Sequence, residues 1–400
     1  MANNNDKKVL NVPALRFPGF TDKWKAGKLE EYIFLVSGQD LSPEQYTDKE
    51  DVYPYITGAS SLNSEGIILN RWTHTPTQIV KRGDILLVCK GSGVGQLSVL
   101  SNVDKAHIAR QIMGIRAKNA ESQLFIYHYL SRFMTELKKR STGIIPGIDR
   151  KSILSLHISI PSLQEQQKVA ELLNLIEQRI ITQNKIIEKY ESLIQAICDT
   201  LIESGQHKIE LSFNDFGEPY SGLSGKSAED FGKGWPYITY MNVYKNQIID
   251  LTDVGLVKIN EIEQQSVVRY GDILFTLSSE TPDEVGMGAV YLGDTYPLYL
   301  NSFCFGVHIT DESKIFPPFL AYYISTKSFR KAVFPLAQGS TRFNLQKNDF
   351  MKKIFHFPTV KKQSEIYSVL KAYSDKLSIE KNIVNLLCEQ KSYLLRQLFI

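Results

Sequence analysis

One half of this sequence repeats the other, and the repeat constrains the fold more than any other feature. Five short matches occur in the same order in both halves. They are Pro54-Tyr-Ile-Thr57 with Pro236-Tyr-Ile-Thr239, Gly83-Asp-Ile-Leu86 with Gly271-Asp-Ile-Leu274, Val94-Gly95 with Val285-Gly286, Phe125 and Tyr129 with Phe319 and Tyr323, and Ile160-Pro161 with Phe357-Pro358. The offset grows from 182 to 197 residues, as a duplication with loop insertions would produce. This period is too long for a solenoid and indicates two copies of one domain.

Each copy is expected to contain short strands, turn-rich loops and one late helix. Thr77–Cys89 is a turn followed by an apolar, β-branched run, which predicts a buried strand. Ser122–Lys139 has helical spacing of aromatic and apolar residues. Its counterpart begins after Pro317-Pro318, because proline is favourable at a helix start.

Each copy ends in a long helix with one apolar stripe. The two stripes are Val169, Leu173, Ile176, Ile180, Gln183, Ile187, Tyr190, Ile194, Ile197 and Leu201, and Ile366, Leu370, Tyr373, Leu377, Glu380, Val384, Leu387, Lys391, Leu394 and Leu398. Each position of the second equals one of the first plus 197. Steps of four and three are coiled-coil spacing. Each helix could instead pack on its own domain, but a helix of about 35–40 residues spans roughly 55–60 Å, more than a small domain. We therefore expect the stripes to pack against each other.

Charge is distributed unevenly along the chain. The formal net charge of +3 does not by itself indicate a nucleic-acid partner. However, residues 116–151 contain eight basic and three acidic side chains, and residues 327–353 contain seven basic and one acidic. Both windows include a small-residue loop, Ser141–Gly147 and Gln338–Asn344, where backbone N–H groups can approach phosphates. A solvated basic face would explain either window alone, but recurrence at equivalent places favours DNA binding.

No catalytic constellation stands out in the sequence. Lys90–Gly95 is glycine-rich, but its lysine precedes the glycines, so a tight loop between strands is favoured over a phosphate-binding loop. Phe316-Pro-Pro-Phe319 is similar to a motif of DNA adenine methyltransferases but lacks the amide or carboxylate, so helix-start prolines explain it better. His128 is expected to be packed rather than a metal ligand. A nuclease centre is excluded least firmly, because its carboxylates can be far apart in sequence.

The four cysteines, Cys89, Cys198, Cys304 and Cys388, form no CxxC pair. A zinc site or disulfide framework is therefore not expected, and lone thiols suit a reducing compartment. No signal peptide or run of about 18 apolar residues is visible, so we expect a cytoplasmic protein.

Three segments carry a resemblance to the specificity subunit of type I restriction-modification systems. Leu15–Trp24 resembles the segment that opens the first recognition domain. Ile160–Val169, which reads Ile-Pro-Ser-Leu-Gln-Glu-Gln-Gln-Lys-Val, resembles the start of the central helix, and the Gly-Asp-Ile-Leu motifs are similar to a strand motif of both domains. The second copy departs from the pattern, with Leu211–Phe216 in place of the opening segment. Its helix start, Pro358–Glu365, keeps Gln363 but not the glutamate.

The resemblance implies a non-catalytic subunit that binds double-stranded DNA with a bipartite site, each domain reading one half. The long helices would form an antiparallel coiled coil that sets the spacer. Two modification subunits, which bind S-adenosylmethionine and methylate adenine, would dock along it, and restriction subunits with translocase and nuclease activity can join. The chain itself would bind no cofactor and no metal. The fold class is then α+β, with a first target-recognition domain at 1–160, the central helix at 161–204, a second recognition domain at 205–357 and the C-terminal helix at 358–400.

Candidate DNA-binding residues come from the basic and polar loops, because Arg, Gln and Asn suit base edges while Ser and Thr more often hold phosphates. They are Lys90, Ser92, Arg110, Gln111, Thr142 and Arg150 in the first domain, and Ser278, Ser279, Asn301, Ser340, Thr341, Arg342 and Asn344 in the second. The candidate partner-docking residues are Ile181, Ile186, Leu193 and Ile202, which widen the apolar faces of the central helix. Two alternatives remain at this point, a stand-alone nuclease with duplicated DNA-binding domains and a coiled-coil scaffold without a DNA role.

Overall fold

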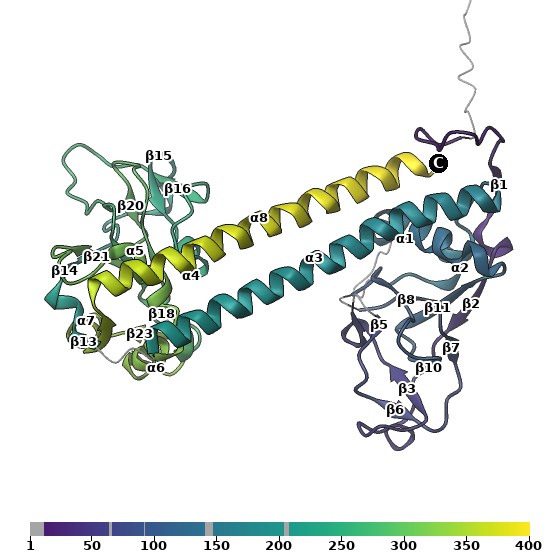
Figure 1. Ribbon diagram of the computed structural model, residues 1–400, viewed down its shortest axis with the longest axis horizontal. Helices are drawn as coiled ribbons and strands as arrows, with labels where there is room; N and C mark the ends of the chain where they lie inside the picture. Colours follow the sequence, from purple (N-terminus) through teal and green to yellow (C-terminus); the bar gives the residue numbers. More distant parts are fainter. Residues whose placement is uncertain (1–11, 64–65, 92, 141–146, 204–207) are drawn as a thin grey trace, which may run out of the picture. The chain divides into compact units, whose positions relative to one another are not determined.

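The computed structural model describes residues 12–63, 66–91, 93–140, 147–203 and 208–400 (Figure 1). The chain divides into two compact units. Unit 1 is Met1–Lys185 with Lys381–Ile400, and unit 2 is Ile186–Glu380. Two long helices, α3 (Leu163–Glu203) and α8 (Val360–Leu398), are each divided between the two units. The predicted pair of long helices is therefore confirmed.

Unit 1 is built on two sheets. One has the antiparallel order β2 (Ile33–Ser37), β11 (Ile112–Ala117), β8 (Ile85–Val88), β9 (Leu97–Val99), and the other the order β6 (Trp72–Thr73), β3 (Tyr53–Ile56), β10 (Lys105–Ile108), β7 (Ile79–Lys81) with β3 and β10 parallel. The pairs β1 (Lys25–Lys28) with β12 (His157–Ile160) and β4 (Leu62–Asn63) with β5 (Gly66–Ile67) complete the strands. The helices are α1 (Gln123–Arg140) and α2 (Arg150–Leu154).

Unit 2 repeats this plan. Its antiparallel sheet has the order β14 (Gly217–Ser221), β21 (Cys304–Ile309), β17 (Ile273–Thr276), β19 (Gly288–Val290), and a second sheet joins β16 (Val254–Val257), β15 (Phe231–Ile238) and β20 (Tyr299–Leu300), with β15 and β20 parallel. Strand β13 (Lys208–Leu211) pairs with β24 (Phe355–Pro358), and β18 (Ser278–Ser279), β23 (Phe343–Leu345) and β22 (Ala337–Gln338) form a third sheet. The helices are α4 (Tyr240–Lys245), α5 (Pro317–Tyr323), α6 (Lys327–Val333) and α7 (Lys347–Lys352).

The repeated Gly-Asp-Ile-Leu motif forms the same turn and buried strand in both units. Gly83 and Gly271 have φ angles of 90° and 87°, in the left-handed region that favours glycine. The next residue closes the turn, since Asp84 accepts the Lys81 N–H at 2.7 Å and Asp272 accepts the Arg269 N–H at 2.8 Å. The strands that follow, β8 and β17, are buried throughout, as predicted.

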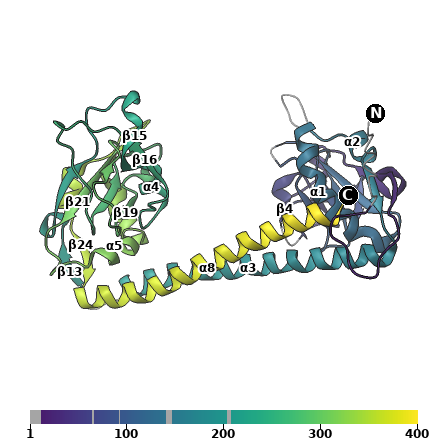
Figure 2. The ribbon, with the colours of Figure 1, turned by 90° about the horizontal axis from the view of Figure 1, so that it is seen from above.

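The ends of the two long helices pack into the cores of the domains. In unit 1, Leu173 near the start of α3 belongs to the same apolar cluster as Leu398 at the end of α8. In unit 2, Ile202 near the end of α3 clusters with Ile366 near the start of α8. The helices therefore run antiparallel within each unit, and the C-terminal end of α8 lies beside α1 of unit 1 (Figure 2).

The late helix differs between the two domains. In unit 1 it is the single helix α1, as the sequence predicts. In unit 2 it starts at Pro317, with the two prolines inside the helix rather than before it. It ends at Tyr323, and α6 begins after Thr326. The Thr326 hydroxyl accepts the Phe329 N–H at 3.3 Å, which caps the new helix. Among the described residues, no helix is both long and apolar enough to cross a membrane.

Candidate nucleic-acid interface

Equivalent loops follow β8 and β17 and hold several of the predicted DNA-binding residues. In unit 1, Lys90 forms an isolated antiparallel bridge with Gly147. In unit 2, Ser278 pairs in the same way with Asn344. Lys90 and Ser278 differ by 188 residues, and Gly147 and Asn344 by 197, which are the offsets of the neighbouring sequence matches. The duplication therefore extends to these loops, where the side chains differ between the copies.

In unit 1, Lys90, Arg110 and Gln111 converge at the end of β8. The Cys89 N–H donates to the Gln111 carbonyl at 2.8 Å, and all three candidate side chains are exposed. Arg110 already has a carboxylate partner, because its Nε lies 2.7 Å from Asp40 Oδ2. Both members of this pair are largely exposed, so the pair is weak enough for a phosphate to compete for the guanidinium.

The other three candidate residues of unit 1 say less about DNA binding. Arg150 is exposed, but its Nη1 donates to the Leu35 carbonyl at 2.7 Å, so part of the guanidinium serves the fold. Ser92 and Thr142 lie outside the described residues. The glycine-rich segment around Ser92 joins β8 to β9, as predicted, and Gly91 and Gly95 have φ angles of 89° and 81°.

In unit 2 the candidates gather on the third sheet. Strands β22 and β23 form a hairpin in which Gln338 pairs with Asn344, and β18 pairs with β23. The exposed tip of the hairpin consists of Ser340, Thr341 and Arg342. Asn301 lies in the turn after β20, where its side-chain oxygen accepts the Phe303 N–H at 2.9 Å.

Ser279 is placed differently from the other candidates. It is buried, and its Oγ donates to Glu284 Oε2 at 3.2 Å. The prediction that this hydroxyl faces DNA is therefore wrong for the structure as it stands, because the side chain is buried and already has a carboxylate partner.

Two aromatic residues of this region were missed by sequence reasoning. Tyr240 donates from its hydroxyl to the Ser278 carbonyl at 2.7 Å, and its pKa is raised mainly by burial. Phe303 is exposed in the turn after β20, next to Asn301. The repeat itself was the available signal, since extending it to Tyr240 and Phe303 places them opposite Gly58 and Gln111 of the first copy.

Part of the basic charge in the two windows serves the fold. Arg116 holds Asp84 with two hydrogen bonds of 2.6 and 2.5 Å across the sheet. The equivalent pair in unit 2 is His308 with Asp272, whose ring nitrogen and carboxylate lie 2.9 Å apart. Arg330 donates to the carbonyls of Asp283, Val285 and Gly286, and burial lowers its pKa. The exposed loop residues, rather than these arginines, remain the candidates for DNA contact.

Polar contacts at the helix starts explain two of the three motifs that carry the resemblance. Arg16 forms hydrogen bonds of 2.7 and 2.8 Å with the two carboxylate oxygens of Glu165 in the first turn of α3. Gln166 donates to the Pro161 carbonyl at 2.9 Å, and Gln363 donates equivalently to the Pro358 carbonyl at 2.8 Å. The second copy keeps the glutamine of this cap. The second copy has no glutamate at the position of Glu165, and it also has no opening segment that could supply a partner arginine.

The candidate docking residues on α3 differ in exposure. Ile181 and Ile186 are half-buried, and Leu193 is 40% exposed. Ile202 is 2% exposed and belongs to the core of unit 2. The prediction that Ile202 offers an apolar surface to a partner is therefore wrong, because the domain covers this end of the helix.

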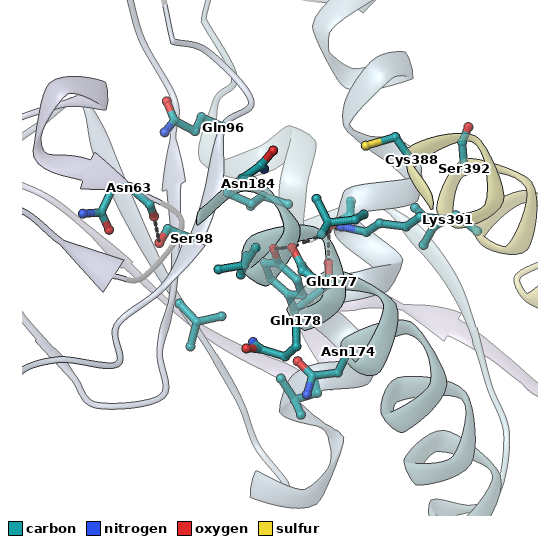
Figure 3. A pocket seen from close by; sticks show the side chains of 18 of the residues that line it. Asn63, Gln96, Ser98, Asn174, Glu177, Gln178, Asn184, Cys388, Lys391 and Ser392 are labelled. Atoms are coloured by element: carbon teal, nitrogen blue, oxygen red, sulfur yellow. Dashed lines mark hydrogen bonds and ion pairs between the residues drawn. The ribbon is translucent and has the colours of Figure 1, made fainter. Parts of the chain in front are cut away.

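A pocket of about 1210 Å³ opens in unit 1 between β9, α1, α3 and α8 (Figure 3). At its wall, the Tyr127 hydroxyl donates to Glu177 at 2.8 Å, and Lys391 of α8 lies 3.1 Å from the same carboxylate. Burial raises the pKa of Tyr127 and lowers the pKa of His128 to about 4. His128 is fully buried, so the prediction that it packs in the core is confirmed. This network ties the end of α8 to α1 and α3.

No group of three or more His, Cys, Asp or Glu side chains that could hold a metal ion occurs within the described part of the chain.

Comparison with known proteins gives one consistent result. The family model described as type I restriction modification DNA specificity domain matches twice, at residues 21–192 and 223–388. The MjaVIII type I restriction enzyme specificity subunit of Methanocaldococcus jannaschii is 23% identical over 401 residues, which cover 94% of this chain and 91% of the relative. A putative MjaX specificity subunit of the same organism is 24% identical over 185 residues, 45% of this chain and 43% of the relative.

Two solved structures have the same fold. The S subunit of a type I restriction-modification system from M. genitalium gives a TM-score of 0.61 at 17% identity, covering 97% of this chain and 99% of that one. A chain from a structure of type I R-M complex assembly and conformational transition gives a TM-score of 0.57 at 15% identity, with coverages of 94% and 97%. The predicted α+β architecture of two similar domains is confirmed, and nothing in these comparisons supports a stand-alone nuclease.

Proposed function

Since the chain belongs to the type I restriction-modification DNA specificity family, we propose that each of its domains reads one half of a bipartite site in double-stranded DNA. The chain supplies recognition and performs no catalysis. The observation that carries this proposal is the duplicated loop cluster, in which Lys90 and Ser278 occupy the same backbone position at the end of equivalent strands. Two loops that share a backbone arrangement but carry different side chains are suited to reading two different DNA sequences.

The chemistry of these loops suits DNA. Lys90 and Arg110 of unit 1 and Arg342 of unit 2 are exposed cations beside amide side chains, Gln111 and Asn344. Cations neutralise phosphates and position the protein, whereas amides make paired hydrogen bonds with base edges. The combination is what sequence-specific binding requires.

The long helices connect the two readers along the chain and carry the partners. Helix α3 contains 41 residues, so its own length is about 60 Å at 1.5 Å per residue. Two modification subunits dock on the apolar side chains that α3 leaves accessible, Ile181, Ile186 and Leu193, and restriction subunits can join them. S-adenosylmethionine binds the modification subunit, and this chain binds no cofactor.

The test is the methylation of DNA in cells that express the chain with its modification subunits. We expect methylated adenines in a two-part motif with a fixed unspecified spacer, and loss of this mark when the chain is deleted. Methylation that persists without the chain, or a continuous motif with no spacer, would contradict the proposed function.

A further inference from the structure

Gln111 and Phe303 occupy the same position in the two domains. The Gln111 carbonyl accepts the Cys89 N–H at 2.8 Å, and the Phe303 carbonyl accepts the Leu277 N–H at 2.9 Å. The turn before each residue is also the same, because the N–H of Ile112 donates to the Ala109 carbonyl and that of Cys304 to the Asn301 carbonyl. Both side chains are exposed at the loop cluster that we assign to DNA.

The Gln111 amide lies in a slot against Gly58, and the slot exists because Gly58 has no side chain. A Cβ atom added to Gly58 would lie 2.7 Å from Gln111 Oε1, and one added to Gly91 would lie 3.8 Å from the same atom. Gly58 is buried although it is in a loop. The amide makes no hydrogen bond to another described residue. The slot therefore holds an amide whose donor and acceptor remain available.

A fixed orientation matters for only one of the roles this amide could have. A phosphate contact needs a donor and tolerates many orientations, whereas an adenine is read by a carboxamide that places its oxygen and its nitrogen together against N6 and N7. In unit 2, Tyr240 and Ser279 replace the two glycines, and Phe303 is 59% exposed. A phenyl ring makes no such hydrogen bonds but packs against the methyl group of thymine.

We propose that Gln111 reads an adenine in one half-site, that Phe303 contacts a thymine methyl group at the corresponding place in the other, and that Gly58 is a positioning residue for Gln111. This inference rests on the proposed function. It assigns the difference in sequence preference between the two domains to one pair of equivalent positions.

Gly58 offers a clean perturbation because the fold does not require a glycine there. Its φ angle of 176° is extended backbone that any residue adopts. Apart from Gln111 and the two chain neighbours of Gly58, no described residue has an atom within 4 Å of a Cβ added at this position. Gly58→Ala should therefore leave the fold intact and displace the amide.

The experiment selects bound sequences from a randomised double-stranded DNA pool with the full chain co-expressed with its modification subunits. We compare the wild type with Gly58→Ala, Gln111→Ala, the double variant and Phe303→Ala. Gln111→Ala should weaken the preference for adenine at one position of one half-site by roughly 5- to 150-fold. Gly58→Ala should weaken the same position and add nothing in the double variant. Phe303→Ala should change one position of the other half-site only.

The outcomes separate the two levels of the argument. If the wild type enriches no two-part motif, the proposed function fails and this inference fails with it. A wild-type motif that Gln111→Ala leaves unchanged overturns the inference alone. A Gly58→Ala variant that binds all sequences more weakly, or that adds a further loss in the double variant, shows a structural rather than a positioning role for Gly58. Equal thermal unfolding of Gly58→Ala and the wild type supports the positioning role.

Discussion

Replacing Arg16 by alanine should destabilise unit 1 selectively, because the arginine is the partner of a buried charge. The side chain of Glu165 is 1% exposed, and that of Arg16 is 15% exposed. The guanidinium reaches both carboxylate oxygens and also donates to the Asp22 carbonyl at 2.6 Å. Arg16→Ala removes all three contacts and leaves a carboxylate in the first turn of α3 without a partner.

The expected loss is about 3 kcal/mol of unfolding free energy, the low end of the range for breaking a buried ion pair. We choose the low end because the arginine keeps some exposure, so water can reach part of the vacated space. For a unit of this size, about 3 kcal/mol corresponds to a fall of roughly 6–12 °C in the unfolding midpoint. Only the transition of unit 1 should move, since neither partner belongs to unit 2.

The assay is differential scanning calorimetry or chemical denaturation of the full chain, with Arg82→Ala as the matched control. Arg82 pairs with Asp104 at 2.9 Å, but their side chains are 56% and 87% exposed, so this loss should stay within about 1 kcal/mol. Adding Glu165→Gln to Arg16→Ala should recover most of the stability by removing the buried charge. Equal losses for Arg16→Ala and Arg82→Ala, or no recovery in the double variant, would refute the reasoning.

Three further predictions concern the DNA loop, a buried histidine and the helix faces. Arg342→Ala should impair only binding of the second half-site. If Arg342 contacts a base, the loss should be about 1–3 kcal/mol at one position, whereas a phosphate contact predicts weaker binding of all sequences and a salt slope lower by about one. Unchanged affinity in filter binding would exclude this hairpin from the DNA interface. His128 has a pKa lowered to about 4 by burial, so the folded state excludes a proton that the unfolded state takes up below its ordinary pKa of about 6.5. Stability of unit 1 should therefore fall between about pH 6.5 and 4, and denaturation of His128→Leu should have a flatter pH profile in that window. Leu193→Glu should weaken co-purification of the modification subunit without changing the unfolding midpoint, whereas Ile202→Glu should lower the unfolding midpoint. If the Leu193 variant co-purifies as well as the wild type, this helix face is not part of the docking surface.

The fold was largely predictable because its information is local and occurs twice. Periodicity over many residues identified both long helices, and left-handed glycines before buried strands explain why Gly-Asp-Ile-Leu recurs. The split of the late helix in unit 2 was not predicted, because it depends on a single capping residue, Thr326, within an apolar stretch that continues the helical pattern.

The candidate site was only partly predictable, because residue type does not reveal a partner. Ser279 has the chemistry of a phosphate ligand, but its own side chain is buried and donates to Glu284. Arg330 lies in a basic window, yet it binds three backbone carbonyls. Ile202 continues an apolar face that the domain covers. Each of these contacts joins residues whose meeting depends on how the chain returns on itself.

The amino-acid sequence by itself determined that the chain holds two similar domains and two long helices in one heptad frame, because repeated motifs and helical periodicity are properties of the order of residues. Only the tertiary structure decided which polar side chains remain available. Gln111 and Gly58 are 53 residues apart, and nothing in the intervening sequence indicates that the missing side chain of one makes room for the amide of the other. A slot of this kind is a relation between atoms in space, so it exists only after the strands that carry it have packed.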